Sequence, residues 1–224
     1  MNKPYQFVKQ GEYVTELLIY GDITSFDWHE SDTGAYSFAK DLAEIDTDII
    51  VRINSYGGEV AEGLAIYNQL KAFKHNVTTV CDGFACSAAS VIFMAGAKRI
   101  MPNSSLLLIH NAWTWTAGDS NELRKQADDL EKITQPSVEI YKSVATISEE
   151  EIKSMMDEET WITAEEALSY GFATEIQKVE AQQKAEDKMM YSLVMKCKQL
   201  EKKLQESSCE EQDAWKSYFK GKRS

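Results

Sequence analysis

An almost uninterrupted apolar run from Asp48 to Asn54, leading into the paired glycines Gly57 and Gly58, is the feature that most constrains the fold. A run of this kind without alternation suits a strand that is buried on both faces. Beyond the glycines, apolar residues recur at spacings of three and four, which predicts a helix. These residues are Val60, Leu64, Tyr67, Leu70 and Phe73. The segment therefore predicts a strand, a glycine turn and a helix as one unit.

The same order of elements returns farther along the chain. We expect a strand at 77–82, a turn at Gly83, a helix of small residues at 87–95 and a further strand from Leu106 to His110. The run from Val14 to Ile23 mixes β-branched and aromatic residues, as strands do. Strands that alternate with helices predict an α/β core with a largely parallel sheet, although strand order cannot be read from the sequence.

Residues 120–145 predict a long polar helix with apolar residues on one side. That side carries Leu123, Leu130, Ile133, Val138 and Tyr141. We expect Pro136 to break or kink this helix, because a proline there removes a hydrogen bond and clashes with the preceding turn. Two shorter helices are predicted to start at Ser148 and Thr163, each followed by a glutamate three residues later, as in a capping box.

The charge of the chain is uneven. The formal net charge is −12, which argues against a protein that wraps nucleic acid by counterion release. Residues 1–177 hold 13 basic and 28 acidic side chains, whereas residues 178–224 hold 11 and 8. We therefore expect a catalytic domain at 1–177 and a charged extension at 178–224. Apolar spacings of three and four in the extension fit a helix against the body, self-association or a partly disordered tail about equally well.

Localisation is predicted from what the sequence lacks. The first residues show no apolar core of a signal peptide, and no apolar stretch is long enough to span a membrane. The four cysteines, at 81, 86, 197 and 209, show no C-x-x-C spacing, so we interpret them as free thiols in a reducing cytosol. We expect a cytoplasmic protein without a metal or other cofactor.

Any chemistry that depends on histidine has three candidates, His29, His75 and His110. The first lies in a polar loop and the second at a helix end, so both are predicted at the surface. His110 ends an apolar run, and a strand end is where a rigid scaffold presents a side chain to a site.

Ser87 follows Gly83 in a segment of small residues at a predicted strand-to-helix turn. A helix N-terminus offers unpaired backbone amides to the negative charge that develops in acyl transfer. A helix-capping role for Ser87 or Ser90 is the competing interpretation. The turn at Gly57 and Gly58 lets a backbone amide approach a ligand, and the absent lysine of a P-loop argues against a phosphate site there.

Several motifs together resemble the ClpP family of serine peptidases. Ile53–Gly58 is similar to the family's I-N-S-P-G-G, with Tyr56 in place of proline, and Ala65–Tyr67 follows as in A-I-Y-D. Gly83–Ser87 resembles the G-x-A-A-S nucleophile turn, and Pro102–His110 resembles P-N-S-x-x-M-I-H. Trp161–Ala167 and the pair Tyr170-Gly171 are similar to the closing helix, so the resemblance covers roughly 14–177.

The resemblance implies a ClpP/crotonase-like core with a protruding handle helix and, beyond it, the C-terminal extension. It makes Ser87 the nucleophile, His110 the base, and the amides of Gly58 and Ala88 the oxyanion hole. An extended substrate would pair near Gly57. The family's catalytic aspartate falls on Glu159, with Asp157 and Glu158 as competitors.

The resemblance also implies partners. The family forms rings, usually of seven subunits stacked in pairs, and an AAA+ unfoldase feeds some of them. Gly-Gly-Glu-Val, Ser-Ala-Ala-Ser and Glu-Thr-Trp are most similar to the phage and prophage branch, whose members process capsid or scaffold proteins. The alternatives are a housekeeping ClpP subunit, a crotonase-type enzyme of acyl-CoA chemistry and an inactive assembly protein. A phage-encoded enzyme would act in the host cytoplasm.

Overall fold

A computed structural model describes residues 7–10, 14–25 and 33–178 of this chain. His29 and the predicted extension beyond Lys178 lie outside the described residues. The elements, in chain order, are β1 (Phe7–Gln10), β2 (Val14–Ile23), α1 (Ala35–Leu42), β3 (Asp48–Gly58), α2 (Val60–Lys71), β4 (Val77–Cys86), α3 (Ala88–Phe93), β5 (Lys98–Pro102), β6 (Leu106–Ile109), α4 (Ser120–Val144), α5 (Glu149–Asp157), β7 (Thr160–Thr163), α6 (Ala164–Ser169) and β8 (Glu175–Gln177).

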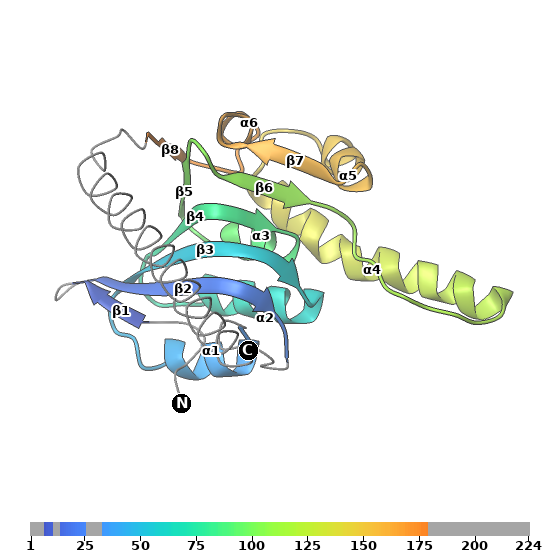
Figure 1. Ribbon diagram of the computed structural model, residues 1–224, viewed down its shortest axis with the longest axis horizontal. Coiled ribbons are helices and arrows are strands. Elements are labelled where there is room, and N and C mark those ends of the chain that lie inside the picture. Colours follow the sequence, from blue (N-terminus) through green and yellow to red (C-terminus); the bar gives the residue numbers. More distant parts are fainter. Residues whose placement is uncertain (1–6, 11–13, 26–32, 179–224) are drawn as a thin grey trace, which may run out of the picture. The chain divides into compact units, whose positions relative to one another are not determined.

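The strands form one mixed sheet in the order β1-β2-β3-β4-β5-β8, and β6 pairs with both β4 and β7. All described pairs are parallel except β1 with β2 and β6 with β7. Figure 1 shows β2, β3 and β4 side by side, with α2 and α3 next to them. The prediction of an α/β core with a largely parallel sheet is confirmed.

The buried core lies between the sheet and these helices. Alternate residues of β3 point into it, so that Ile49, Val51 and Ile53 are at most 1% exposed while their neighbours are partly exposed. Phe93 of α3 is fully buried. Each such side chain contributes roughly 1.5–3 kcal/mol on burial, which holds the strand-turn-helix units in register.

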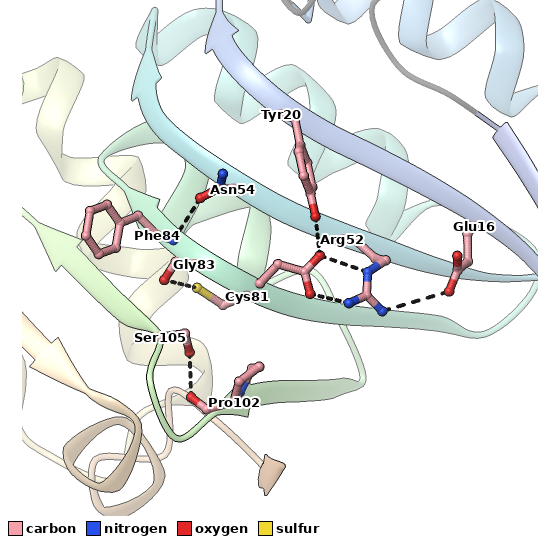
Figure 2. A network of polar contacts seen from close by, with 10 residues as sticks. Glu16, Tyr20, Arg52, Asn54, Cys81, Gly83, Phe84, Pro102 and Ser105 are labelled. Atoms are coloured by element: carbon pink, nitrogen blue, oxygen red, sulfur yellow. Dashed lines mark hydrogen bonds and ion pairs between the residues drawn. The ribbon is translucent and has the colours of Figure 1, made fainter. Parts of the chain in front are cut away.

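The predicted turn at Gly83 was wrong, because β4 continues to Cys86 and the chain turns at Ser87. The register between β3 and β4 shifts between Ile53 and Ser55, which places extra β4 residues around Gly83 in an irregular stretch of strand. The side chain of Asn54 covers this stretch and accepts a hydrogen bond from the Phe84 amide at 3.2 Å (Figure 2). The glycine thus marks a bulge rather than the end of the strand.

Of the two expectations for Pro136, a break was wrong, since α4 runs without interruption from Ser120 to Val144, and a kink stays a prediction. A proline in a helix costs about 3 kcal/mol. Beyond it, Val138 and Tyr141 are at most 2% exposed, and their burial offsets that cost. The earlier part of α4 projects from the body (Figure 1), so Leu123 and Ile133 of the predicted apolar side are each 43% exposed.

The two predicted helix starts are confirmed. Ser148 accepts a hydrogen bond from the Glu151 amide at 3.1 Å and caps α5. Thr163 and Glu166 form a complete capping box at α6. Within the described ranges, no helix combines the length and the apolar character needed to cross a membrane.

A polar network joins three parallel strands on the sheet face away from the core (Figure 2). Asp82 of β4 accepts hydrogen bonds from Tyr20 of β2 at 2.6 Å and from Arg52 Nε of β3 at 2.8 Å. Arg52 also lies 3.9 Å from the Glu16 carboxylate. Partial burial and the bond to Asp82 raise the pKa of Tyr20 to about 12, so this hydroxyl stays a donor at neutral pH. The network clamps β2, β3 and β4 together.

Candidate active site

Ser87 is the single residue between β4 and α3, and its backbone has a positive φ, with φ 54° and ψ −125°, which L-residues rarely adopt. Its amide still belongs to the sheet and donates to the Leu108 carbonyl at 2.9 Å. A non-glycine residue in this region costs of order 1–3 kcal/mol and persists only where its surroundings enforce it. Strain of this kind clusters at functional sites.

The competing interpretation of Ser87 as a helix cap is not supported. Ser87 occupies the N-cap position of α3, but its side chain makes no capping hydrogen bond. Asp119, Ser148 and Thr163, which precede other helices, all make such a bond. The other candidate cap, Ser90, lies inside α3. The Ser87 hydroxyl is therefore not committed to the helix.

The glycine turn of β3 packs directly against the Ser87 turn. Gly57 has φ 96°, and a Cβ built on it would lie 2.5 Å from the Cys86 carbonyl oxygen and 2.7 Å from the Ser87 Cβ. Gly58 has φ 151°, and a Cβ there would lie 2.0 Å from the Ile23 carbonyl oxygen. Only glycine fits at either position, because backbone approaches within the space that any side chain needs.

The amide of Gly57 is already used inside the turn. It donates to Ser55 Oγ at 3.0 Å, and Ser55 Oγ donates in turn to the Gly21 carbonyl at 2.5 Å. These two bonds fix the path of the chain where β3 ends. The Gly57 amide is thus committed to the turn, and the role of the Gly58 amide as an oxyanion donor stays a prediction.

His110 comes one residue after β6, and β6 runs parallel to β4 with Cys86 paired to Leu108. The carboxyl ends of neighbouring parallel strands open at the same edge of a sheet, where ligands of α/β proteins bind. Ser87 and His110, both half-buried, are therefore brought to one edge although 23 positions separate them in sequence.

A cavity of about 770 Å³ opens at this edge, and Ser87, His110, Gly57, Gly58 and Ala88 all line it. Apolar walls come from α2 and α3, and Tyr141 reaches the cavity from α4. A largely apolar cavity with a few convergent polar groups is the usual form of a ligand site. Glu159 is the only predicted catalytic residue that does not line the cavity.

Glu159 directly precedes β7, and His110 directly follows β6. β6 and β7 are antiparallel with Leu108 opposite Trp161 and Ile109 opposite Thr160, so the pairing ends one residue short of both His110 and Glu159. The two residues therefore lie at the same end of this strand pair. Glu159 and Ser87 are also the two non-glycine residues with positive φ in the described part of the chain, at 50° and 54°.

The competing carboxylate Asp157 has another partner, since its Oδ1 accepts a hydrogen bond from Asn111 Nδ2 at 2.7 Å. This bond ties the end of α5 to the residue after His110. Among the described residues, no hydrogen bond joins Ser87 to His110 or His110 to Glu159. Catalytic hydrogen bonds are often longer before substrate binds.

Cys86, next to Ser87, is a potential rival nucleophile. It is 1% exposed, and burial raises the pKa of its thiol to about 11. Because the thiolate is the reactive form of cysteine, this side chain is inert at neutral pH. Both Cys81 and Cys86 are free and buried, as the sequence predicted.

The surroundings of the site were only partly foreseen. His75, predicted at the surface, is half-buried and lies 2.9 Å from Asp46 through Nε2. The helical pattern of α4 indicates that Tyr141 is buried, but nothing local in the sequence links it to the cavity. Among the described residues, no group of three or more His, Cys, Asp or Glu side chains is placed to hold a metal ion.

Comparison with known proteins agrees with the motifs. The family model described as Clp protease matches residues 37–180. An ATP-dependent Clp protease proteolytic subunit of Deinococcus radiodurans is 34% identical over 133 residues, which cover 58% of this chain and 65% of that protein. Subunit 3 of Rhodococcus jostii is 35% identical over 60% of this chain and 67% of its own length.

A longer match is found in Corynebacterium glutamicum. Its ATP-dependent Clp protease proteolytic subunit 1 is 30% identical over 184 residues, which cover 76% of this chain and 88% of that protein. The first two relatives are matched over about two thirds of their length. Together with a family match over more than half of the sequence, these comparisons show that the chain belongs to the Clp protease family.

Proposed function

We propose that this protein is a serine endopeptidase whose nucleophile is Ser87. The observation that carries the proposal is the strained turn at φ 54°, which places a serine free of capping bonds in a cavity shared with His110, Gly58 and Ala88. Membership of the Clp protease family supports the same activity.

In the proposed reaction, Ser87 Oγ attacks the carbonyl carbon of a peptide bond while His110 takes the hydroxyl proton. The amides of Gly58 and Ala88 stabilise the negative oxygen of the tetrahedral intermediate. His110 then gives its proton to the leaving amine as the C–N bond breaks. Water, deprotonated by His110, then attacks the acyl carbon, and His110 returns the proton to Ser87 Oγ as the ester bond breaks, which releases the acid and restores both residues. Glu159 orients His110 and stabilises its charged form.

The test is labelling of the full chain by a fluorophosphonate probe, which bonds to activated serines. We expect rapid labelling of the wild type and none of Ser87→Ala, with circular dichroism and melting temperature showing that the variant is folded. His110→Ala should lower the labelling rate by several orders of magnitude, because the serine loses its base. Labelling of Ser87→Ala at the wild-type rate would assign the nucleophile elsewhere, and an unlabelled wild type would favour the inactive assembly protein.

The physiological role is proposed at two levels. The names of the relatives favour a proteolytic subunit of an ATP-dependent Clp protease, fed by an AAA+ unfoldase. The motifs of the phage branch favour processing of capsid or scaffold proteins instead. Both roles imply a ring, for which the projecting α4 with its exposed Leu123 and Ile133 offers contact surface. A cytoplasmic location stays a prediction.

Mass spectrometry distinguishes the two roles. The wild type and Ser87→Ala would each be co-expressed with the structural proteins encoded beside this chain, and in parallel incubated with a Clp unfoldase, ATP and an unfolded substrate. Cleavage of a structural protein without ATP, absent in Ser87→Ala, supports maturation. Degradation that requires both unfoldase and ATP supports the Clp role. Native mass spectrometry of the same samples gives the ring size.

A further inference from the structure

The carbonyl oxygen of Ser87 receives three hydrogen bonds. Two come from backbone amides of α3, Ser90 at 2.9 Å and Val91 at 3.3 Å, as at the start of many helices. The third comes from the side chain of Ser90, whose Oγ lies 2.6 Å from the same oxygen. The shortest bond to this carbonyl is thus one that the helix does not require.

The Ser90 hydroxyl has a second partner, the Tyr141 hydroxyl of α4 at 2.8 Å. A serine hydroxyl has one proton to donate, and Ser90 gives it to Ser87, so Tyr141 must donate to Ser90. Both side chains are buried, Ser90 at 0% and Tyr141 at 1% exposed. The result is a directed chain from Tyr141 through Ser90 to the carbonyl of Ser87.

The peptide bond that carries this carbonyl also carries the amide of Ala88. Because the peptide group is planar and trans, its C=O and N–H point in opposite directions. Bonds that pull the Ser87 oxygen toward Ser90 therefore aim the Ala88 N–H the other way. Ala88 lines the cavity, and a Cβ on Gly57 would lie 3.0 Å from its nitrogen. Hydrogen bonds to a carbonyl also polarise the N–H of the same peptide group.

We propose that Tyr141 and Ser90 form a positioning relay, which sets the direction of the Ala88 amide so that it stabilises the oxyanion during acylation. The inference rests on the proposed peptidase function. It assigns a role to a buried polar pair that the Ser-His-Glu reaction does not itself use. It also connects Tyr141 of α4, 51 positions away from Ser90 in sequence, to the turn that carries Ser87.

The experiment measures inactivation by the fluorophosphonate probe, separating the maximal rate constant from the concentration for half-maximal rate. Ser90→Ala removes the side-chain donor to the Ser87 carbonyl. We expect the maximal inactivation rate of this variant to fall on the order of 10-fold with unchanged probe affinity, because the Ala88 amide remains but points in a less favourable direction. Tyr141→Phe leaves Ser90 bonded to Ser87 and should cost only about 3-fold. Tyr170→Phe is the matched control, because the described structure gives its hydroxyl no hydrogen bond.

The double variant Ser90→Ala with Tyr141→Phe separates positioning from stability. Ser90→Ala alone leaves the buried Tyr141 hydroxyl without its hydrogen-bond partner and should lower the melting temperature. Removal of both hydroxyls leaves no unpaired hydroxyl and should restore much of the lost melting temperature. The inactivation rate should nevertheless stay as low as in Ser90→Ala. Recovery of the rate together with the melting temperature would reduce the pair to a structural role, as would wild-type rates in both single variants. Failure of the wild type to react would overturn the proposed function instead.

Discussion

Two neighbouring parallel strands, β3 and β4, end in turns that pack against each other. At the end of β3 the chain turns through Gly57 and Gly58, whose φ values of 96° and 151° suit glycine. After β4 it turns through Ser87, where a residue with a side chain adopts a φ of 54°. The first turn contributes only backbone to the cavity, so it uses residues for which this geometry costs little. The second must also deliver a hydroxyl, and the surroundings have to enforce the strain.

Glu159 shares the positive φ of Ser87, and these two are the non-glycine residues with positive φ in the described part of the chain. Glu159 directly precedes β7, whose pairing with β6 ends one residue short of both Glu159 and His110. The strained positions of this protein thus coincide with the two ends of the proposed triad. In the proposed mechanism, the glycines shape the site and the strained residues Ser87 and Glu159 take part in the reaction. The following variants test that division, from the largest expected effect to the smallest.

Glu159→Gln should lower the acylation rate by about 10²- to 10⁴-fold, because the amide no longer stabilises the charged histidine. Asp157→Asn should lower it much less, since Asp157 is bonded to Asn111 rather than to His110. Single-turnover acylation kinetics of the two variants, side by side, decide between them. The reverse order would transfer the role to Asp157 and remove Glu159 from the comparison.

Gly57→Ala should damage both stability and activity. The new Cβ would meet the Cys86 carbonyl and the Ser87 Cβ at 2.5 and 2.7 Å, so the two turns must move apart. We expect a loss of about 1–3 kcal/mol in unfolding free energy. The acylation rate should fall on the order of 100-fold, as for a displacement of about 1 Å. Gly118→Ala in the loop before α4 is the control, because the nearest atoms to its Cβ would all belong to the Glu122 side chain of the α4 capping box, and neither residue lines the cavity. Equal rates in both variants would mean that Gly57 does not shape the site.

Ser87→Gly and Ser87→Ala should both be inactive but differ in stability. Alanine keeps the strain at φ 54°, whereas glycine relieves it. Relief of about 1–3 kcal/mol exceeds the roughly 0.5–1 kcal/mol that glycine costs through unfolded-chain entropy. Ser87→Gly should therefore be more stable by about 1 kcal/mol in urea unfolding. A more stable alanine variant would show that the turn is not strained.

Cys86→Ala should leave fluorophosphonate labelling of Ser87 unchanged, because the buried thiol is protonated at neutral pH. Its effect appears in alkaline stability. Burial raises the pKa of Cys86 from 9.0 to about 11, so its contribution is complete below pH 9 and is lost as the pH rises to 11. Unfolding free energies across this window should fall more steeply in the wild type than in Cys86→Ala. Rapid alkylation of Cys86 by iodoacetamide in the folded protein at pH 7 would contradict this account.

The strand-turn-helix units and the two glycine positions could be predicted from the sequence, because burial periodicity and turn residues depend on local geometry and side-chain polarity. Ser87 and His110 were chosen through the resemblance of their motifs to the ClpP family, and their roles remain predictions. The predicted turn at Gly83 and the predicted break at Pro136 were wrong. At both positions, a residue that locally favours a break is outweighed by contacts with distant parts of the chain. At Gly83 the strand continues as a bulge that Asn54 covers, and at Pro136 the burial of Val138 and Tyr141 stabilises the helix.

Only the tertiary structure decided which residues from distant parts of the sequence lie close together. The pairing of β6 with β7 brings His110 and Glu159 to the same end of these two strands, and the packing of α4 brings Tyr141 to Ser90. The strain at Ser87 was equally invisible in the sequence, because it exists only when the sheet holds its amide and α3 its carbonyl. Contacts between positions tens of residues apart are fixed by how whole elements pack. A local pattern can place a residue on the buried side of its element, and only the assembled fold gives that residue its partner.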